Sequence, residues 1–441
     1  MSQQQASLAE AMQVGDLRKR IGFVFLGMAI FVLTVHVGIP GINLTVWKSL
    51  LSQGALFQFL GMFTGGALFN FSIGAMGITP YINASIIMQL LTVVVPQLKD
   101  MQKEGGELGR RKIAWYTRCL TMTLAFLQAT MMVLSLRSYR GATGEGVFMI
   151  NNVFYYAMVI FTLMAGTAFL MWLGEQMSDK GIGNGVSLLI FGGISLSFPQ
   201  YFQQTMQLAN VRGPQFWVAL GVFLAIFVLL IMAIIYVTIG QRKVPVQYPK
   251  RQVGRRVYGG HSTFIPIRVN NAGVISIIFA ISIMYLPNTL LTFLPKDATW
   301  LVPIQTFYER WFIPTGVLYN LCYAGLVIFF TYFYSAITLN VQDLADNLRK
   351  HGGFIPGIRP GKPTVDYLER LLSRITLVSA LFLAFIAVFP TFLMQATGVT
   401  NFYLGSTSML IIVGVALDTM QQIQARLVMR QYQGFMKQQG S

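Results

Sequence analysis

The side chains best suited to specific chemistry in this sequence are three arginines in two long, basic segments. Arg255 and Arg256 lie in KRQVGRRVY, and Arg359 lies in the turn-rich stretch FIPGIRPG. A guanidinium group is a rigid fork of donors that binds carboxylates and phosphates through two parallel hydrogen bonds. The alternative role is to orient the chain in a membrane, which needs positive charge but no fixed turn. We favour partner binding, because both segments are longer than orientation requires.

Residues for catalysis, metal binding or ion coupling are few and scattered. The chain has 15 Asp and Glu residues and three His. His261 and His351 lie in predicted loops and His36 lies near the end of an apolar run, so no cluster has metal-ligand spacing. Asp418 is well inside an apolar run and Glu175 is near the end of another, whereas proton-coupled transporters usually carry several such groups. No GxxxxGK[ST] loop occurs. We therefore expect no enzymatic activity, no metal and no cofactor.

The composition is that of an integral membrane protein. The chain is 54% hydrophobic and 11% charged, whereas a soluble domain is about a quarter charged. A helix that crosses the bilayer core needs about 20 mostly apolar residues. Ten stretches approach that length and predict an all-α polytopic fold. They lie near Ile21–Ile39, Ser72–Val95, Ala114–Leu136, Val153–Met177, Gly185–Tyr201, Gln215–Gly240, Asn271–Leu291, Thr315–Leu339, Leu371–Leu393 and Phe402–Ile423.

Positive charge is divided unevenly by these stretches. Of the 32 Lys and Arg residues, 26 fall on one side of the predicted spans. The six on the other side are Lys48, Arg137, Arg140, Arg212, Lys296 and Arg310. Because short loops rich in Lys and Arg remain in the cytoplasm, we expect both termini to be cytoplasmic.

Ten spans divide into two sets of five, residues 1–209 and 210–441. Because five is odd, two similar halves would have opposite topologies, as in the inverted repeats of many transporters. Between the first two spans, Phe57–Phe71 is apolar but short and broken by glycines. This segment is either a re-entrant half-helix surrounded by protein or water, or a helix held at the interface by aromatic side chains.

Two predicted cytoplasmic loops are longer than simple connections. In the first, about residues 241–269, Gly259-Gly260 lies between two short β-like runs and suggests a protruding hairpin. In the second, about residues 340–370, a helical run ends at a glycine pair, and the pattern of Pro and Gly at Ile355–Pro363 predicts a fixed turn.

Several long motifs resemble the SecY family, the channel subunits of the bacterial-type protein translocase. They are GGALFNFSIGAMGITPYINASIIMQLL, KEGGELGRRKIAWYTR, MWLGEQMSDKGIGNGVSLLIF, KRQVGRRVY and ADNLRKHGGFIPGIRPG. They follow the family's order and extend over about residues 18–430. The resemblance implies ten helices in two inverted halves around a central pore, which opens sideways to lipid. It also implies a re-entrant plug half-helix at about residues 57–71, with plug residues Phe57, Leu60, Phe63, Gly65, Gly66 and Leu68.

A ring of branched apolar side chains would seal such a pore, because a narrow apolar constriction excludes water and ions. Ile78 and Ile82 are four residues apart and share a helix face, as do Val186 and Ile190. Taken alone, such residues usually face lipid or the protein core. The resemblance assigns the ring to six residues: Ile78, Ile82, Val186, Ile190, Ile278 and Ile411.

The resemblance also implies sites for the sideways opening and for partners. It places Asn83 and Gln128 at the lateral gate, where weak polar contacts of about 0.6–2 kcal/mol hold a seam that must open. Ordinary interhelical hydrogen bonding is the alternative role of both residues. Arg255, Arg256 and Arg359 would dock the SecA ATPase or the ribosomal RNA backbone. Further implied partners are SecE-like and SecG-like membrane subunits, signal peptides, nascent polypeptides and the lipid bilayer.

The expected function is that of a passive protein-conducting channel in the bacterial inner (plasma) membrane, or a thylakoid membrane, driven by an external motor or ribosome. One alternative is a secondary solute transporter with inverted repeats, which would require an intramembrane charged constellation. The other is a non-transporting scaffold that docks ribosomes, which would leave the apolar ring and the plug without a role.

Overall fold

A computed structural model describes residues 15–53, 61, 64–103, 105–139, 145–248, 250–253, 256–259, 262–293, 302–312, 316–399 and 406–438. The chain divides into two compact units. Unit 1 comprises Met1–Gln207, Asn288–Val302 and Val415–Ser441, and unit 2 comprises Leu208–Pro287 and Pro303–Gly414. The inverted symmetry of the halves 1–209 and 210–441 stays a prediction.

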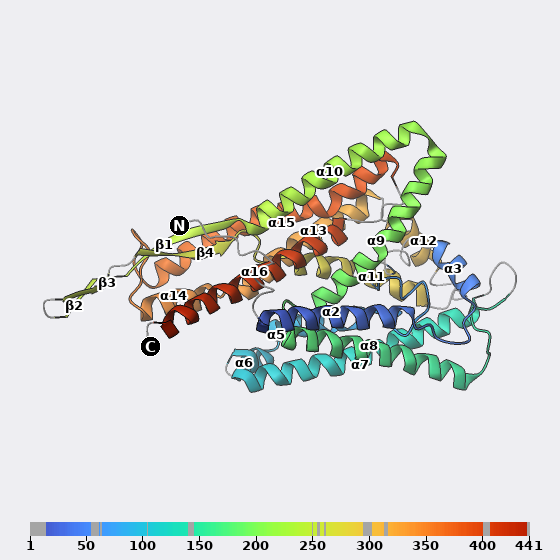
Figure 1. Ribbon diagram of the computed structural model, residues 1–441, viewed down its shortest axis with the longest axis horizontal. Coiled ribbons are helices and arrows are strands. Elements are labelled where there is room, and N and C mark those ends of the chain that lie inside the picture. The colour runs from blue at the N-terminus through green and yellow to red at the C-terminus, as the bar shows by residue number, and fades with distance from the viewer. Residues whose placement is uncertain are drawn as a thin grey trace. The chain divides into compact units, whose positions relative to one another are not determined.

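Unit 1 contains mostly long helices. The helices α2, α8 and α7 run side by side in Figure 1, and α5 packs against α7. The helices are α2 (Gly15–His36), α3 (Leu44–Gln53), α5 (Thr79–Val94), α6 (Pro96–Lys103), α7 (Gly106–Ser138), α8 (Val153–Lys180), most of α9 (Gly185–Arg212) and the greater part of α16 (Ser406–Gln438).

Unit 2 combines helices with a small antiparallel sheet. In this unit α15 packs against both α13 and α10. The helices are α10 (Pro214–Ile239), most of α11 (Ile275–Phe293), most of α12 (Val302–Trp311), α13 (Val317–Thr338), α14 (Val341–Lys350), α15 (Lys362–Thr397) and the start of α16. The strands are β1 (Gln241–Gln247), β2 (Lys250–Val253), β3 (Arg256–Gly259) and β4 (Ser262–Arg268).

Local sequence signals explain several helix ends. The side chain of Asn152 accepts a hydrogen bond from the Phe154 N–H and so caps α8. Helix α10 begins with a proline directly after Gly213, the position where proline's missing donor costs least. Helix α15 ends at Gly398, whose φ of +69° is the left-handed conformation common at helix ends.

Most predicted spans correspond to long helices. Within the described residues, seven helical stretches are long and apolar enough to cross a membrane. An eighth counts if the pair α5 and α6, which bends by 102°, is one span. The apolar part of α11 is shorter, at Ile275–Met284. The polytopic helical architecture is therefore present, and the count of ten spans stays a prediction.

The second predicted span starts later than expected. Residues 64–78 form a series of turns, and α5 begins only at Thr79. Two backbone hydrogen bonds of 3.0 Å tie residues 71–73 to residues 37–39, at the end of α2. The predicted start at Ser72 is wrong, because these turns are apolar and buried like a helix but satisfy their backbone groups through other contacts.

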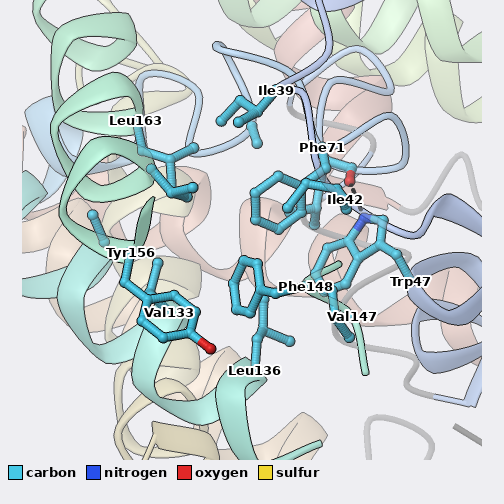
Figure 2. Packing of buried hydrophobic residues seen from close by; sticks show 14 of the residues in the cluster. Ile39, Ile42, Trp47, Phe71, Val133, Leu136, Val147, Phe148, Tyr156 and Leu163 are labelled. Carbon is cyan, nitrogen blue, oxygen red and sulfur yellow. Dashed lines mark hydrogen bonds between the residues drawn. The ribbon is translucent and has the colours of Figure 1, made fainter. Parts of the chain in front are cut away.

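A buried aromatic cluster joins α3, the turns before α5, and α8. Phe71 is fully buried, and its ring meets those of Trp47 and Phe148 edge-on, with centroids 5.0 and 6.4 Å away. Tyr156 packs against Phe148 in the same manner, at 5.2 Å. Figure 2 shows these rings packed together with the aliphatic side chains of Ile39 and Leu163. Edge-on aromatic pairs add specific attraction to the burial of apolar area.

The first long loop forms two antiparallel ladders, β1–β4 and β2–β3, with β2–β3 continuing outward from β1–β4 (Figure 1). The predicted hairpin is therefore confirmed, but its turn is not at Gly259-Gly260. Gly259 is part of β3 and pairs with Lys250, and the pair Val253–Arg256 closes the described ladder. Residues 254 and 255, between β2 and β3, lie outside the described residues.

Candidate functional site

Four of the six predicted ring residues lie in unit 1. Ile78 is the N-cap of α5, and Ile82 lies one turn further, with its N–H donating to the Ile78 carbonyl at 3.1 Å. Val186 and Ile190 lie in the first two turns of α9. Ile78 and Ile190 are buried, whereas Ile82 and Val186 are half-buried. Each pair therefore lies on one helix face, as the spacing of four residues predicts.

A tight turn between α8 and α9 fixes the start of α9. The Ser178 hydroxyl accepts a hydrogen bond from the Gly185 N–H at 2.8 Å, and the Asn184 side-chain oxygen accepts one from the Val186 N–H at 3.0 Å. A Cβ atom on Gly185 would lie only 2.0 Å from the Gly174 carbonyl oxygen. Glycine at position 185 therefore permits the two helices to approach closely, directly before the ring residues of α9.

Helix α16 holds the same turn. Gly183 has a φ of +88°, which glycine adopts without steric cost, and its N–H donates to Oε1 of Gln422 at 3.0 Å. A small buried cluster, formed by Leu17, Ile182, Ile423 and Leu427, joins the turn to α2 and α16. Sequence reasoning missed Ser178 and Gln422. The glycines of GIGNG marked a tight turn, but no local signal identified its distant partner.

The other two ring residues lie in unit 2. Ile278 is in the first turn of α11 and half-buried, and its N–H donates to the Val274 carbonyl at 3.1 Å. Ile411, near the start of α16, is fully buried. A Cβ atom on Gly414 would lie 2.1 Å from Cγ2 of Val274, so α16 and the start of α11 are in close contact. The structure thus places the ring residues as a set of four in unit 1 and a set of two in unit 2.

Part of the predicted plug segment is anchored in the aromatic cluster. Residues 64–71 are turns rather than a half-helix. Leu68 is buried, and its carbonyl accepts a 2.7 Å hydrogen bond from Nε1 of Trp47. Gly65 and Gly66 both have positive φ, and a Cβ atom on Gly65 would lie 3.1 Å from the Gly193 Cα of α9. The remaining predicted plug residues, Phe57, Leu60 and Phe63, lie outside the described residues.

The predicted gate residues lie on neighbouring helices. Asn83 is on α5 and Gln128 is on α7, and both side chains are half-buried. These two helices pack against each other within unit 1. Elsewhere on α7, Nε of Arg118 donates to Oε1 of Glu175 on α8 at 2.8 Å. This ion pair gives a partner to Glu175, the acidic residue that the sequence placed near the end of a span.

The two long loops form one folded body in unit 2, which we call the loop module: β1, β4, α14, residues 353–361 and the first turns of α15. Gln247 at the end of β1 exchanges two backbone hydrogen bonds with Phe354, of 2.9 and 3.0 Å. A continuous apolar cluster underlies the module. It includes Val244, Val246, Ile267, Leu348, Ile355, Leu368 and Leu372. The sequence predicted two separate loops, whereas their pairing is a long-range contact.

Of the predicted docking arginines, Arg359 belongs to this module. Arg359 is exposed, in a turn where Gly357 and Gly361 have φ of +81° and +106°. The Thr364 hydroxyl donates to the Arg359 carbonyl at 2.9 Å and so fixes the turn before α15. The fixed turn predicted from Pro and Gly is confirmed. Arg256 begins β3, and Arg255 lies outside the described residues.

Comparison with known proteins gives a match over most of the chain. The SecY family model matches residues 72–420. The protein translocase subunit SecY of Streptomyces scabiei is 42% identical over 442 residues, covering 98% of this chain and 99% of that protein. The corresponding subunits of Thermotoga maritima and Escherichia coli K12 are each 42% identical, and the alignments cover 97% and 96% of this chain and 96% and 95% of those proteins.

Solved structures share the fold at lower identity. A protein-conducting channel has a TM-score of 0.63 at 17% identity, with 92% of this chain and 91% of that chain covered. The channel Sec61 in a canine ribosome–channel complex has a TM-score of 0.55 at 16% identity, over 92% of this chain and 91% of its own. These likenesses support the fold, and the sequence matches support the family. The chain belongs to the SecY family of membrane-embedded protein translocation channels.

Proposed function

We propose that this chain is a gated, passive channel that passes unfolded secretory polypeptides across the membrane and releases the helices of membrane proteins sideways into lipid. The observation that carries the proposal is the 42% identity, over almost the whole chain, to bacterial translocase subunits. The arrangement of the site fits a conduit rather than an enzyme, because its predicted central residues are apolar and hold no reactive group.

In this proposal the six branched residues seal the closed pore. A neutral, apolar constriction passes segments of either charge and loses its water when empty, so ions do not follow. The tight α8–α9 turn supports the seal because it fixes Val186 and Ile190 against helix rotation. The plug segment closes the pore on the outer side, and its end at Leu68 is held by Trp47.

The lateral gate then provides the exit for apolar segments. Asn83 and Gln128 offer weak polar contacts, which hold the closed seam and still allow separation. Helices α5 and α7 pack together, so we expect them to move as a pair when the gate opens.

Energy and direction come from partners. We propose that SecA or a translating ribosome docks on the loop module through Arg359 and on the adjoining β2–β3 segment through Arg255 and Arg256. SecE-like and SecG-like subunits complete the proposed membrane complex. Arg359 is exposed on a fixed turn. Because the backbone turn that carries the side chain is already fixed, less entropy is lost when the guanidinium group binds a phosphate or carboxylate.

The proposed location is the bacterial inner membrane, or a thylakoid membrane, with both termini and the loop module in the cytoplasm. Single cysteines introduced at Lys48 and Lys296 should react with a membrane-impermeant thiol reagent added outside intact cells, and a cysteine at Arg359 should not. Labelling of position 359 from outside would contradict the proposed orientation.

The function is tested by reconstitution. Vesicles containing the chain and its copurifying subunits, supplied with SecA, ATP and an unfolded secretory precursor, should protect the precursor from added protease. Omission of ATP should abolish protection. If the vesicles instead take up small solutes and protect no precursor, the chain is a transporter. If they bind ribosomes but protect nothing, it is a docking scaffold.

A further inference from the structure

A groove at the junction of α13, α14 and α15 has a lining that none of the proposed channel functions uses. Its volume is about 360 Å³, which is within the usual range for a small-molecule site. All of its walls belong to unit 2. The lining residues are Tyr332, Ser335, Ala336, Leu339, Asn340, Val341, Gln342, Glu369, Leu372, Ser373 and Thr376.

In the topology predicted from the sequence, the groove lies at the level where membrane helices meet water. Helix α13 ends at Thr338, and α14 continues the chain from Val341. On α15 the groove occupies residues 369–376, where the charged first turns give way to the apolar stretch. Lipid headgroups occupy this level of the bilayer at high local concentration.

The polar lining suits a cationic or zwitterionic headgroup. Among the described residues of the lining, Glu369 is the one charged side chain, and it is exposed to an incoming ligand. The nearby Arg370 is not among the lining residues, and its Nε donates to the Asp366 carbonyl at 3.1 Å. A carboxylate at a membrane surface attracts an ammonium group, which supplies up to three donors.

Donors for a phosphate group are also present. Ser335 and Thr376 are buried and share a hydrogen bond of 2.9 Å between their hydroxyls. Such a pair uses one hydroxyl hydrogen and retains a second to donate. Tyr332, Ser373 and the amide of Gln342 add donors around the same groove.

An apolar surface continues from the groove along the helices. Leu339 and Leu372 are part of the lining. Beyond them Ile337 on α13 and Leu377 and Leu381 on α15 are exposed, at 41%, 47% and 54% of their surface. Exposed aliphatic side chains on a transmembrane helix are suited to packing against acyl chains.

We propose that this groove binds an aminophospholipid such as phosphatidylethanolamine. Glu369 receives the ammonium group, the hydroxyl and amide groups receive the phosphate, and the acyl chains lie against α13 and α15. A groove of opposite character lies on α7, where Arg111 and Lys112 lie beside Trp115 and Tyr116. This second groove has a lining suited to an anionic lipid and therefore serves as an internal comparison.

The test uses the full chain in its purified complex, placed in nanodiscs of phosphatidylethanolamine and phosphatidylglycerol and analysed by native mass spectrometry. Glu369→Gln should reduce retained phosphatidylethanolamine about tenfold, because hydrogen bonds to a charged group are roughly twice as strong as neutral ones. Retained phosphatidylglycerol should not change. Lys112→Gln, the matched control, should leave phosphatidylethanolamine unchanged.

Two further measurements keep the proposal falsifiable. Ala336→Trp would fill the exposed rim of the groove and should displace the same lipid independently of charge. Phosphatidylcholine, whose ammonium has no N–H donor, should be retained less than phosphatidylethanolamine. Equal retention of all three lipids, or retention of phosphatidylethanolamine unchanged by both groove substitutions, would overturn the proposal. So would copurification of a protein segment in the groove that excludes lipid.

Discussion

The α8–α9 turn and the loop module place functional residues in different ways. At the turn, short hydrogen bonds hold the start of α9, and apolar residues follow it. Glycines at 183 and 185 permit close packing, because a Cβ atom on either would lie 2.0–3.0 Å from a neighbouring atom. In the loop module, an apolar base supports an exposed arginine. A seal must be both apolar and closely packed, whereas a docking surface must keep its charges in water. The first region should therefore be sensitive to small changes of shape, and the second to changes of charge.

The largest effect is expected from Ile190→Asn. Ile190 is buried, and an amide there lacks partners and attracts water into an apolar constriction. We expect ion conductance of reconstituted membranes to rise about tenfold or more. Ile190→Leu, which remains apolar, should leave conductance near that of the parent. A variant as tight as the parent would remove Ile190 from the seal.

The next effect is expected from Arg359→Glu. The side chain is exposed, so stability should change by no more than about 0.5 kcal/mol. Affinity for SecA or ribosomes should fall about tenfold, because a charge-assisted fork is replaced by a like charge. Lys362→Glu is the matched control, since it makes the same charge change at a nearby exposed position. If both variants lose affinity equally, general electrostatics rather than a specific contact explains docking.

A smaller effect is expected where α16 meets the turn. Gln422→Ala removes the acceptor of the Gly183 N–H, and the start of α9 should become less fixed. We expect export of precursors with defective signals to increase about threefold. Expressed as a free energy, this factor is roughly half of the net stabilisation by a typical hydrogen bond. Gln422→Glu retains an acceptor oxygen and should export such precursors at the parental rate. Equal export by both variants would show that the contact does not position the ring.

The smallest functional effect, with a measurable loss of stability, is expected from Trp47→Phe. The ring remains, but the Leu68 carbonyl loses a buried 2.7 Å hydrogen bond. Leaving a buried acceptor unpaired costs about 1–3 kcal/mol, so thermal unfolding in detergent should occur at a lower temperature. Trp115→Phe, at an exposed position, should have little effect. If the two variants unfold at the same temperature, the hydrogen bond from Trp47 does not anchor the segment that contains Leu68.

The sequence predicted what depends on local composition. The apolar runs predicted both ends of α8 and α10 to within three residues, because each helix is long, continuous and begins at a cap or a proline. The fixed turn around Arg359 followed from its glycines and prolines. Resemblance added the ring residues, whose spacing alone was compatible with ordinary packing, and the identity of the partners expected at the three arginines.

The sequence did not predict what depends on distant partners. The pairing of Gln247 with Phe354 and of Gly183 with Gln422 joins segments more than 100 residues apart. Residues 64–78 are as apolar as a span, so composition could not distinguish their turns from helix. The hairpin turn was misplaced because Gly259 fits a strand as well as a turn once Lys250 pairs with it.

The most direct test of the account is export of a precursor with a defective signal, compared in the same membranes for the parent, Ile190→Asn and Arg359→Glu. A loosened seal should raise this export, and a weakened docking surface should lower it, while both proteins remain inserted and abundant. The account predicts opposite changes from the two variants. Changes in the same direction, or none, would contradict the division between an apolar seal and a charged docking module.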